Sequence, residues 1–564
     1  MKKYLLLLCL TLSAQAADRY WVLGTANWTA ANTVNWSATS GGLGGETVPG
    51  AGDNVFFDSS SSVANAAYTV TLATDTALCL NLNMAGPGAG NAVTWAGSVA
   101  LTISGNMNIQ SSGVVTITYT GAITFNATTS KTITSNGKTY LSAFTFNGVG
   151  GTWALADALS TTGALTLTNG TFDAANGSVN AAVTASSWSS SNSNTRALIV
   201  GSGAWSLTGN NATVWLMITC TNFTLTRGSA INLTYSGGTG TRTIDHVTDA
   251  TEANSPDISI TAGTDIISFT VAGKVHNLNF TGFGAGSWAN IQITIYGNLT
   301  VSSSQTVTAG TKTLTFAATS GTQVITSATK NLDFPITINA PGATVQLADN
   351  LAMGTATNRG LTLTAGTLDL NSLTLTHFGS VTNTGAVTRV FAFGTNGAYT
   401  NTLTTGSTVW NATGSGFTTT GTGTMKYSGT HSGSSQTFIG GGYTYPNLWY
   451  TNAASGFFLL IDGNTFVDFK CTDTNTQTIK FTAGTTTTCS TFTVSGAAAN
   501  LITVTSITAA THTLNVTSTA RQISDYLNVS YSTVTPIMRL YARNSTDGGN
   551  NYAWVFGWPS MVAF

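Results

Sequence analysis

An internal duplication constrains this chain more than any other feature of its sequence. Residues 144–159, which begin Phe-Thr-Phe-Asn, align without a gap with residues 336–351, which begin Ile-Thr-Ile-Asn. Shortly afterwards, Leu-Thr-Leu-Thr-Asn-Gly-Thr-Phe-Asp at 165–173 returns as Leu-Thr-Leu-Thr-Ala-Gly-Thr-Leu-Asp at 361–369. Weaker matches extend the two copies to about 79–173 and 275–369. A chain that repeats itself in this way is expected to stack similar units on one another.

Within each copy, apolar residues alternate with Thr, Ser and Asn. Leu165, Leu167 and Phe172 show this alternation in the first copy, and Leu361 and Leu363 show it in the second. A period of two places the apolar residues on one face of a β-strand and the polar residues on the other. The strands are short and end at Asn-Gly, Gly-Gly or Ala-Gly turns. No helical period appears in the mature chain.

Short strands with a single apolar face must stack to enclose a core. We therefore predict an all-β fold, an elongated parallel β-helix (β-solenoid) with an internal duplication and terminal caps. Turns of about twenty to twenty-five residues are expected. The alternative is a series of tandem β-sandwiches, because turn signals at short spacing fit that architecture as well.

The composition supports an ordered protein and excludes some partners. Only 7% of the 564 residues are charged, and 42% are hydrophobic, whereas disordered chains are polar, charged and poor in apolar residues. The 19 basic and 20 acidic residues give a formal net charge of −1. Binding to a nucleic-acid backbone requires clustered Lys and Arg, and we see no such cluster. We therefore expect no nucleic-acid partner, and we find no cofactor motif.

We predict four regions along the chain. Residues 1–16 resemble a secretory signal peptide, with Lys2 and Lys3 before a short apolar run and Ala14-Gln15-Ala16 at the cleavage site. That run is too short to cross a bilayer, so we expect no transmembrane anchor. Residues 17–60 form a Trp/Gly-rich N-terminal module. Residues 61–445 form the solenoid repeats, and 446–564 form a C-terminal β-rich segment with a cap.

The N-terminal module carries a pattern of Trp, Pro, Asp and Phe. The residues are Asn27-Trp28, Asn35-Trp36, Pro49, Asp53 and Phe56. In this respect the chain resembles secreted, adhesin-like surface proteins of the autotransporter-associated β-strand repeat type. The resemblance implies a β-solenoid exposed outside the cell. We expect no translocator barrel of the kind that true autotransporters have at their C-terminus.

Trp21, Trp28 and Trp36 have two interpretations. Flat aromatic faces can stack on pyranose rings, so the three residues are candidate ligand-binding residues. Alternatively, the indoles cover the open end of the solenoid, because terminal repeats need a cap and aromatic side chains bury large areas. We favour the cap.

One polar cluster lies between the two copies. Asp245, His246 and Asp249 are weak candidates for acid/base catalysis or metal binding. Asp245 and His246 are adjacent, however, so on a strand they would point to opposite faces. The following residues, 248–257, resemble a solvated loop that interrupts one turn of the solenoid, and we favour that interpretation.

Four aspartates recur at equivalent places in the duplicated block: Asp157 with Asp349, and Asp173 with Asp369. A catalytic residue seldom needs a second copy far along the chain, whereas Asp is a frequent turn residue. We therefore interpret these aspartates as turn-forming.

The C-terminal segment contains Asn-Ser-Thr-Asp-Gly-Gly-Asn-Asn at 544–551, followed by Trp554 and Phe556. It is similar to the closing segment of a widespread type of secreted repeat protein, which implies a cap. Asn544, Asp547 and Asn550 are weak candidates for Ca²⁺ binding. A single Asp makes a poor calcium site, so we favour a hydrogen-bonded turn.

The cysteines suggest one disulfide bond. Cys471 and Cys489 lie 18 residues apart, which is about one expected solenoid turn, so we predict that they stack and pair in an exported protein. No CxxC spacing indicates a structural zinc site.

The leading functional hypothesis is a secreted or cell-surface structural or adhesive protein. It would present a Thr/Asn-rich solenoid to glycans or other cell-surface components. A second hypothesis is a polysaccharide-degrading β-helix enzyme that uses the cluster around Asp245. A third is a fibre like those of phage or virion tails. The fold alone does not choose among them.

Overall fold

A computed structural model describes residues 16–29, 33–62, 64–109, 114–210, 212–269, 272–289 and 292–557. The predicted signal peptide, apart from Ala16, lies outside the described residues. Strands make up 49% of the structure and helices 1%, which confirms the all-β prediction. The chain divides into two compact units. The first runs to Tyr235 and includes Arg242–Ile258, and the second comprises Ser236–Thr241 and the residues from Ser259 onward.

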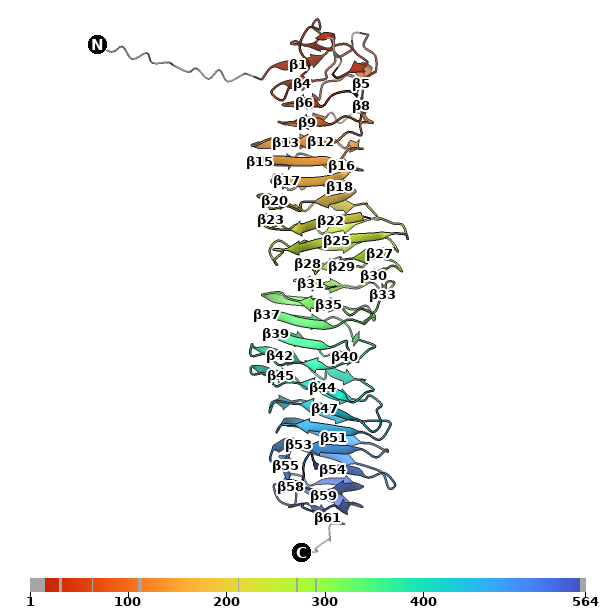
Figure 1. The fold of residues 1–564 in the computed structure, drawn as a ribbon, viewed down its shortest axis with the longest axis vertical. Coiled ribbons are helices and arrows are strands. Elements are labelled where there is room, and N and C mark those ends of the chain that lie inside the picture. Colours follow the sequence, from red (N-terminus) through yellow and green to blue (C-terminus); the bar gives the residue numbers. More distant parts are fainter. Residues whose placement is uncertain are drawn as a thin grey trace, which may run out of the picture. The chain divides into compact units, whose positions relative to one another are not determined.

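Each unit is a stack of short parallel strands around its own apolar core, that is, a parallel β-solenoid (Figure 1). In the first unit, Ile123 pairs with Phe144 and Phe144 pairs with Leu165. The chain therefore returns to the same place after 21 residues. The two units together contain about 20 turns. Parallel pairing confirms the solenoid and not the alternative sandwiches, whose neighbouring strands are antiparallel.

In the first unit the strands form three columns. One column contains β6 (Ala77–Cys79), β9 (Leu101–Ile103), β12 (Ile123–Phe125), β15 (Phe144–Leu155), β17 (Ala164–Asp173), β19 (Ser187–Ser189), β22 (Ala212–Thr219) and β25 (Thr241–Thr248). The second contains β4 (Asn54–Phe56), β7 (Leu82–Met84), β10 (Met107–Ile109) and β13 (Ser130–Thr134), then the second halves of β15 and β17, then β20 (Arg196–Ile199) and β23 (Phe223–Thr226). The third contains β2 (Ala26–Asn27), β5 (Tyr68–Leu72), β8 (Val93–Gly97) and β11 (Val115–Ile117), and is followed by β14 (Thr139–Tyr140), β16 (Leu159–Thr161), β18 (Val183–Ala185), β21 (Trp205–Leu207) and β24 (Ile231–Leu233).

Two long columns organise the second unit. One contains β28 (Gly273–Val275), β31 (Ile293–Ile295), β34 (Leu314–Phe316), β37 (Ile336–Leu347), β39 (Leu361–Asp369), β41 (Val381–Thr382), β44 (Ser407–Asn411), β47 (Ser435–Ile439), β50 (Phe457–Ile461), β52 (Thr478–Phe481), β54 (Ile502–Ser506) and β57 (Leu527–Val529). The other contains β36 (Asn331–Leu332), β38 (Leu351–Met353), β40 (Thr374–His377), β43 (Ala398–Asn401), β46 (Thr424–Tyr427), β49 (Asn447–Tyr450), β51 (Thr465–Thr472), β53 (Thr486–Ser495), β55 (His512–Val516) and β58 (Ser532–Thr535). β42 (Arg389–Ala392) and β45 (Phe417–Thr420) extend the second half of β39.

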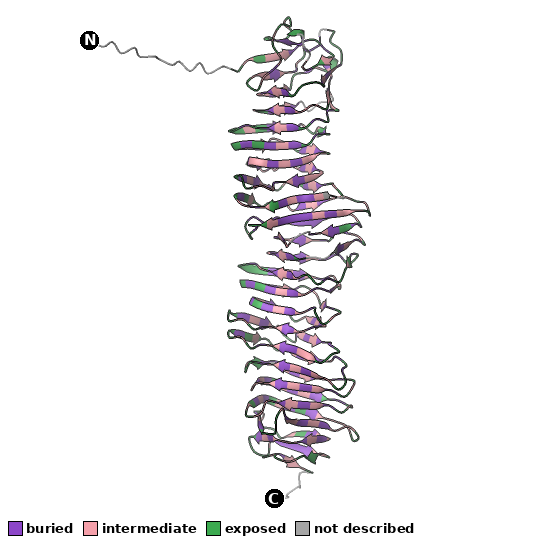
Figure 2. Cartoon of the chain, in the orientation of Figure 1, coloured by how far each residue is buried: buried purple, intermediate pink, exposed green. Residues whose placement is uncertain are grey.

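The core consists of columns of stacked side chains. Most strands alternate buried and partly exposed residues, and Figure 2 shows this alternation along them. The register places Leu101, Ile123, Phe144, Leu165 and Trp188 one above another, and all five are buried. Burying a large apolar side chain stabilises a fold by roughly 1.5–3 kcal/mol. The period-two pattern of the sequence therefore predicted the inward and outward faces correctly.

The structure shows the duplication and extends it. β15 and β37 have the same length and burial pattern, and each has the same two register shifts against the next strand. The equivalence continues to the buried pair Arg196 and Arg389, whose neighbours are Gly170 and Gly366. The equivalence of the two copies extends to strands β22 and β44, each of which has a register shift against the next strand of its column. Few residues are identical in these later strands, so the sequence alone showed only 79–173 and 275–369.

The two ends of the described chain contain elements that differ from the repeated parallel strands. At its N-terminal end, β1 (Asp18–Trp21) pairs antiparallel with β3 (Trp36–Ser37) and parallel with β4. In the second unit, the Trp554 side chain is 8% exposed and its indole N–H donates to Ser532 Oγ at 3.0 Å. Such elements protect the open edges of a solenoid. The predicted domain boundaries near residues 60 and 445 stay predictions.

Candidate functional site

The predicted acidic cluster does not assemble into an open site. Asp245 and His246 lie in β25 and point to opposite faces, as expected, and both are buried (6% and 0% exposed). The His246 ring contacts Trp215, whose Nε1 is 3.3 Å from Nδ1, and Cys220, whose Sγ is 3.7 Å from Nε2. Asp249 follows the strand in a turn with φ = 59°, and its carboxylate accepts a hydrogen bond from Thr221. Asp249 therefore lies outside the strand that contains Asp245 and His246. The predicted loop follows the strand, but it is only partly solvated, because Ala250, Asn254 and Ser255 are buried.

Trp21, Trp28 and Trp36 are fully buried and pack against one another. Trp36 makes edge-to-face contacts with both other indoles, each with ring centroids 5.0 Å apart, and Phe57 contacts all three. The indole N–H of Trp21 donates to the Gly24 carbonyl at 2.7 Å. This is the packing expected of a cap, and it leaves no indole face at the surface for a sugar.

The Asn/Asp-rich C-terminal segment forms a hydrogen-bonded turn. The Asp547 carboxylate accepts hydrogen bonds from the Gly549 N–H at 2.9 Å and from the Asn551 side chain at 2.6 Å. The Asn544 side chain donates to Asp525 at 3.3 Å, and Asn550 occupies a left-handed position (φ = 59°). Within the described part of the chain, no group of three or more His, Cys, Asp or Glu side chains is placed to hold a metal ion.

The register excludes the predicted Cys471–Cys489 bridge. Both cysteines are buried in the neighbouring strands β51 and β53, but Cys489 pairs with Phe466 and Cys471 pairs with Val494. The thiols are thus five positions apart along the strands, or roughly 16 Å at about 3.3 Å per residue, whereas a disulfide requires Cα atoms within about 7 Å. The prediction was wrong because this turn of the solenoid contains 23 residues and not 18. Burial raises the pKa of the Cys489 thiol to about 12.

The repeated aspartates stabilise corners of the solenoid. Asp157 accepts hydrogen bonds from the backbone N–H groups of Ser135 and Asn136, and Asp349 accepts them from Ser327 and Ala328 in the same way. Each carboxylate thus holds the corner of the preceding turn of its solenoid. Asp173 and Asp369 accept from backbone N–H groups two residues further on in their own corners. The prediction is confirmed for Asp173 and Asp369, whereas Asp157 and Asp349 hold a corner of the neighbouring turn and not their own.

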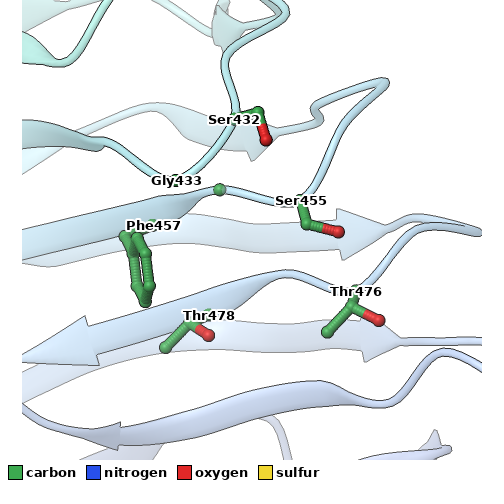
Figure 3. Close-up of a pocket in the computed structure, with 7 residues that line it drawn as sticks. Ser432, Gly433, Ser455, Phe457, Thr476 and Thr478 are labelled. Carbon is green, nitrogen blue, oxygen red and sulfur yellow. The ribbon is translucent and has the colours of Figure 1, made fainter.

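A shallow pocket of about 300 Å³ lies on the surface of the second unit, at three successive corners before β47, β50 and β52. Figure 3 shows Phe457 and Thr478 on neighbouring strands, with Ser432, Ser455 and Thr476 at the corners. Phe457 pairs with Thr478, so the half-buried ring lies beside a hydroxyl group. The pocket therefore combines one aromatic ring with several hydroxyl groups, each of which can donate and accept hydrogen bonds.

A buried network of amides holds these corners in place. The Asn452 side chain donates to the His431 carbonyl at 2.8 Å, and the Gln477 side chain donates to the Asn452 and Ala454 carbonyls at 2.9 and 2.6 Å. Burial lowers the pKa of His431, so its ring is neutral at pH 7. A Cβ at Gly456 would lie 2.4 Å from the Asn452 side chain, so only glycine fits there. Satisfied buried networks of this kind make the surface above them rigid.

A second surface pocket of about 280 Å³ lies on the column that contains β46, β49 and β51. Trp449 is half-buried on the outer face of β49, and Thr424, Asn447, Asp468 and Lys470 line the pocket with it. Two lysines approach the indole: Lys426 Nζ lies 4.4 Å and Lys470 Nζ lies 4.3 Å from the ring centroid.

Sequence reasoning missed both pockets, although a signal was present. In β50 all three outward residues, Phe457, Leu459 and Ile461, are apolar. Trp449 occupies an outward position in β49, whose other outward residue is the polar Asn447. An aromatic residue that breaks the alternation in this way is a better indicator of a surface site than a Trp-rich module. The pairing of Trp449 with two lysines required the register, which the sequence does not show.

The fold defines the chain as a β-solenoid repeat protein. Comparisons with protein-family models, curated proteins and solved structures found no match. Among the residues that the structure describes, no helix has the length and apolar character needed to span a membrane.

Proposed function

We propose that this protein is a secreted or cell-surface repeat protein that binds polysaccharide without cleaving it. The proposal rests mainly on the pocket around Phe457. There a half-buried aromatic ring lies among serine and threonine hydroxyls, at rigid corners before paired strands. Sugar rings present both apolar C–H faces and hydroxyl groups, and binding sites combine apolar surface with a few well-placed polar groups.

Other features support this proposal. The surface is coated with Thr, Ser and Asn and carries few charges, so it offers hydrogen-bonding groups over a large area. The residues that would serve an enzyme, Asp245 and His246, are buried on opposite faces of one strand. The predicted signal peptide and the resemblance to adhesin-like surface proteins support a location outside the cell.

The test uses the mature protein and a panel of dextran, laminarin, polygalacturonate and heparin, with retention and product chain length measured together. We expect retention without shortening. Phe457→Ala should weaken binding to the neutral polymers roughly three- to tenfold, because an aromatic contact contributes about 0.5–1.5 kcal/mol. Tyr552→Ala is the matched control, because Tyr552 is an exposed aromatic residue (63%) that does not line this pocket.

Two results would overturn the proposal. Shortened chains would identify an enzyme. The absence of retention on all four polymers would leave a structural role without a glycan ligand. Thermal unfolding of Phe457→Ala should match that of the unmodified protein to within a few degrees, which separates loss of binding from loss of folding.

A further inference from the structure

Trp449 stands at the centre of an outward-facing row of side chains. The register places Lys426, Trp449, Lys470 and Thr493 in consecutive strands at the same position. Each lysine therefore comes from the turn of the solenoid before or after that of Trp449. The indole holds both ammonium groups by cation–π attraction, which is strongest for Trp. We call Lys426, Trp449 and Lys470 the lysine clamp.

Charged residues are scarce in this part of the molecule. Strands β43, β46, β49, β51 and β53, all fully described, contain two lysines and one aspartate as their only charged side chains. Both lysines belong to the clamp. The aspartate is Asp468, whose carboxylate accepts hydrogen bonds from the hydroxyls of Thr491 and Thr493 in the next strand. Within these strands, therefore, no ion pair with a carboxylate holds either lysine in position.

We infer that the lysine clamp binds an anionic polysaccharide that runs along the axis of the second solenoid. This inference rests on the proposed function and specifies the class of ligand. Lys426 and Lys470 lie in strands two spacings apart, roughly 9.6 Å at the backbone, and their ammonium groups lie 4.4 and 4.3 Å from the same ring centroid. The two positive charges therefore follow one another along the axis in one outward-facing row. A polymer with a carboxylate or sulfate on repeated sugars can contact both.

The neighbouring groups fit the uncharged parts of such a polymer. Thr424 and Asn447 face the pocket from the strands of Lys426 and Trp449, and their side chains can bind sugar hydroxyls. Each ammonium group has three donors, so a lysine that faces the ring still offers donors to an anion on its other side.

The experiment measures binding of the full mature chain to polygalacturonate, heparin, dextran and single-stranded DNA at low and high salt. Lys426→Gln and Lys470→Gln should each weaken binding to the acidic polysaccharide roughly two- to fivefold, as expected for exposed charge pairs. High salt should weaken binding of the unmodified protein, because exposed charges are screened. Asp468→Asn should strengthen binding, which is the opposite sign. Lys131→Gln, in strand β13 of the first unit, is the matched control and should change nothing.

The outcomes separate this inference from the proposed function. Binding to polygalacturonate or heparin that both clamp variants weaken supports the inference, and the preferred polymer identifies carboxylate or sulfate as the anion. Retention on dextran alone, or equal binding by the clamp variants and the unmodified protein, overturns the lysine clamp and leaves the proposed function intact. Equal binding to DNA overturns the assignment to polysaccharide. No binding to any polysaccharide overturns both.

Discussion

Two buried arginines, Arg196 and Arg389, occupy equivalent positions in the duplicated solenoids, and their surroundings differ. Arg196 donates hydrogen bonds to the backbone carbonyls of Ser190, Asn194 and Thr221. Arg389 donates to Ser415 at 2.6 Å, while its Nε and Nη1 have no partner among the residues described. Burial lowers the pKa of both guanidinium groups. Hydrogen bonds therefore offset the cost of burial at Arg196 far better than at Arg389.

We predict that Arg196→Met and Arg389→Met have different effects on stability. Arg196→Met should lower the free energy of unfolding by about 1–3 kcal/mol, because several buried carbonyls lose their donor. Arg389→Met should change it by less than about 1 kcal/mol or raise it, because an apolar side chain replaces a poorly paired buried charge. Urea unfolding of both variants measures the difference. A larger loss in Arg389→Met than in Arg196→Met would contradict this account.

At the scale of the strand, each element is stabilised mainly by the turns directly before and after it. β17 pairs with β15 on one side and with β19 and β20 on the other. Leu167, which is fully buried in β17, lies next to Phe146 of β15. In such a stack, stability is approximately a sum of turns and nearest-neighbour contacts. Damage to one strand should therefore spread to its neighbours and fade with distance.

Leu167→Asn tests this expectation. The substitution places an unpaired amide in the core and should destabilise the first unit by roughly 2–5 kcal/mol. Hydrogen exchange should increase in β15, β17 and β19 and stay nearly unchanged in β5. Thr166→Asn, at the adjacent outward position, is the control and should have little effect. A uniform rise in exchange across the first unit would show a single cooperative core and would refute the nearest-neighbour view.

At the scale of the molecule, buried histidines make stability depend on pH. Burial lowers the pKa of His377 and of His512 to about 4 each, from an ordinary value of 6.5. His377 Nε2 lies 2.7 Å from the Arg359 carbonyl, and His512 contacts the Ser506 and Ser532 hydroxyls at 2.9 and 3.1 Å. Both rings are therefore neutral in the folded second unit at pH 7.

We predict that the second unit loses stability as the pH falls from about 6.5 to about 4. In that range the unfolded chain binds protons that the folded histidines do not, so protonation favours unfolding. Each histidine accounts for up to roughly 3 kcal/mol across the range. Thermal unfolding at a series of pH values measures the effect, and His377→Gln and His512→Gln should each flatten the profile. A profile in the variants as steep as in the unmodified protein would exclude these residues as its cause.

The amino-acid sequence by itself determined the class of structure. The alternation of Leu165 and Leu167 with threonines settles which side chains point inward, because the two faces of a strand alternate with a period of two. The copies that begin at Phe144 and Ile336 adopt the same strands for the same reason. The sequence also allowed turn aspartates such as Asp173 to be predicted, because Asp173 accepts hydrogen bonds from backbone N–H groups of its own corner.

Only the tertiary structure decided which residues lie side by side between turns. Turns contain 21 residues between Phe144 and Leu165 but 29 between Trp215 and Ile244, because the corners vary in length. A difference of a few residues at a corner changes every neighbour in the next strand. For this reason the spacing of Cys471 and Cys489 predicted a bridge that the register excludes, and the sequence could not show that Trp449 lies between two lysines.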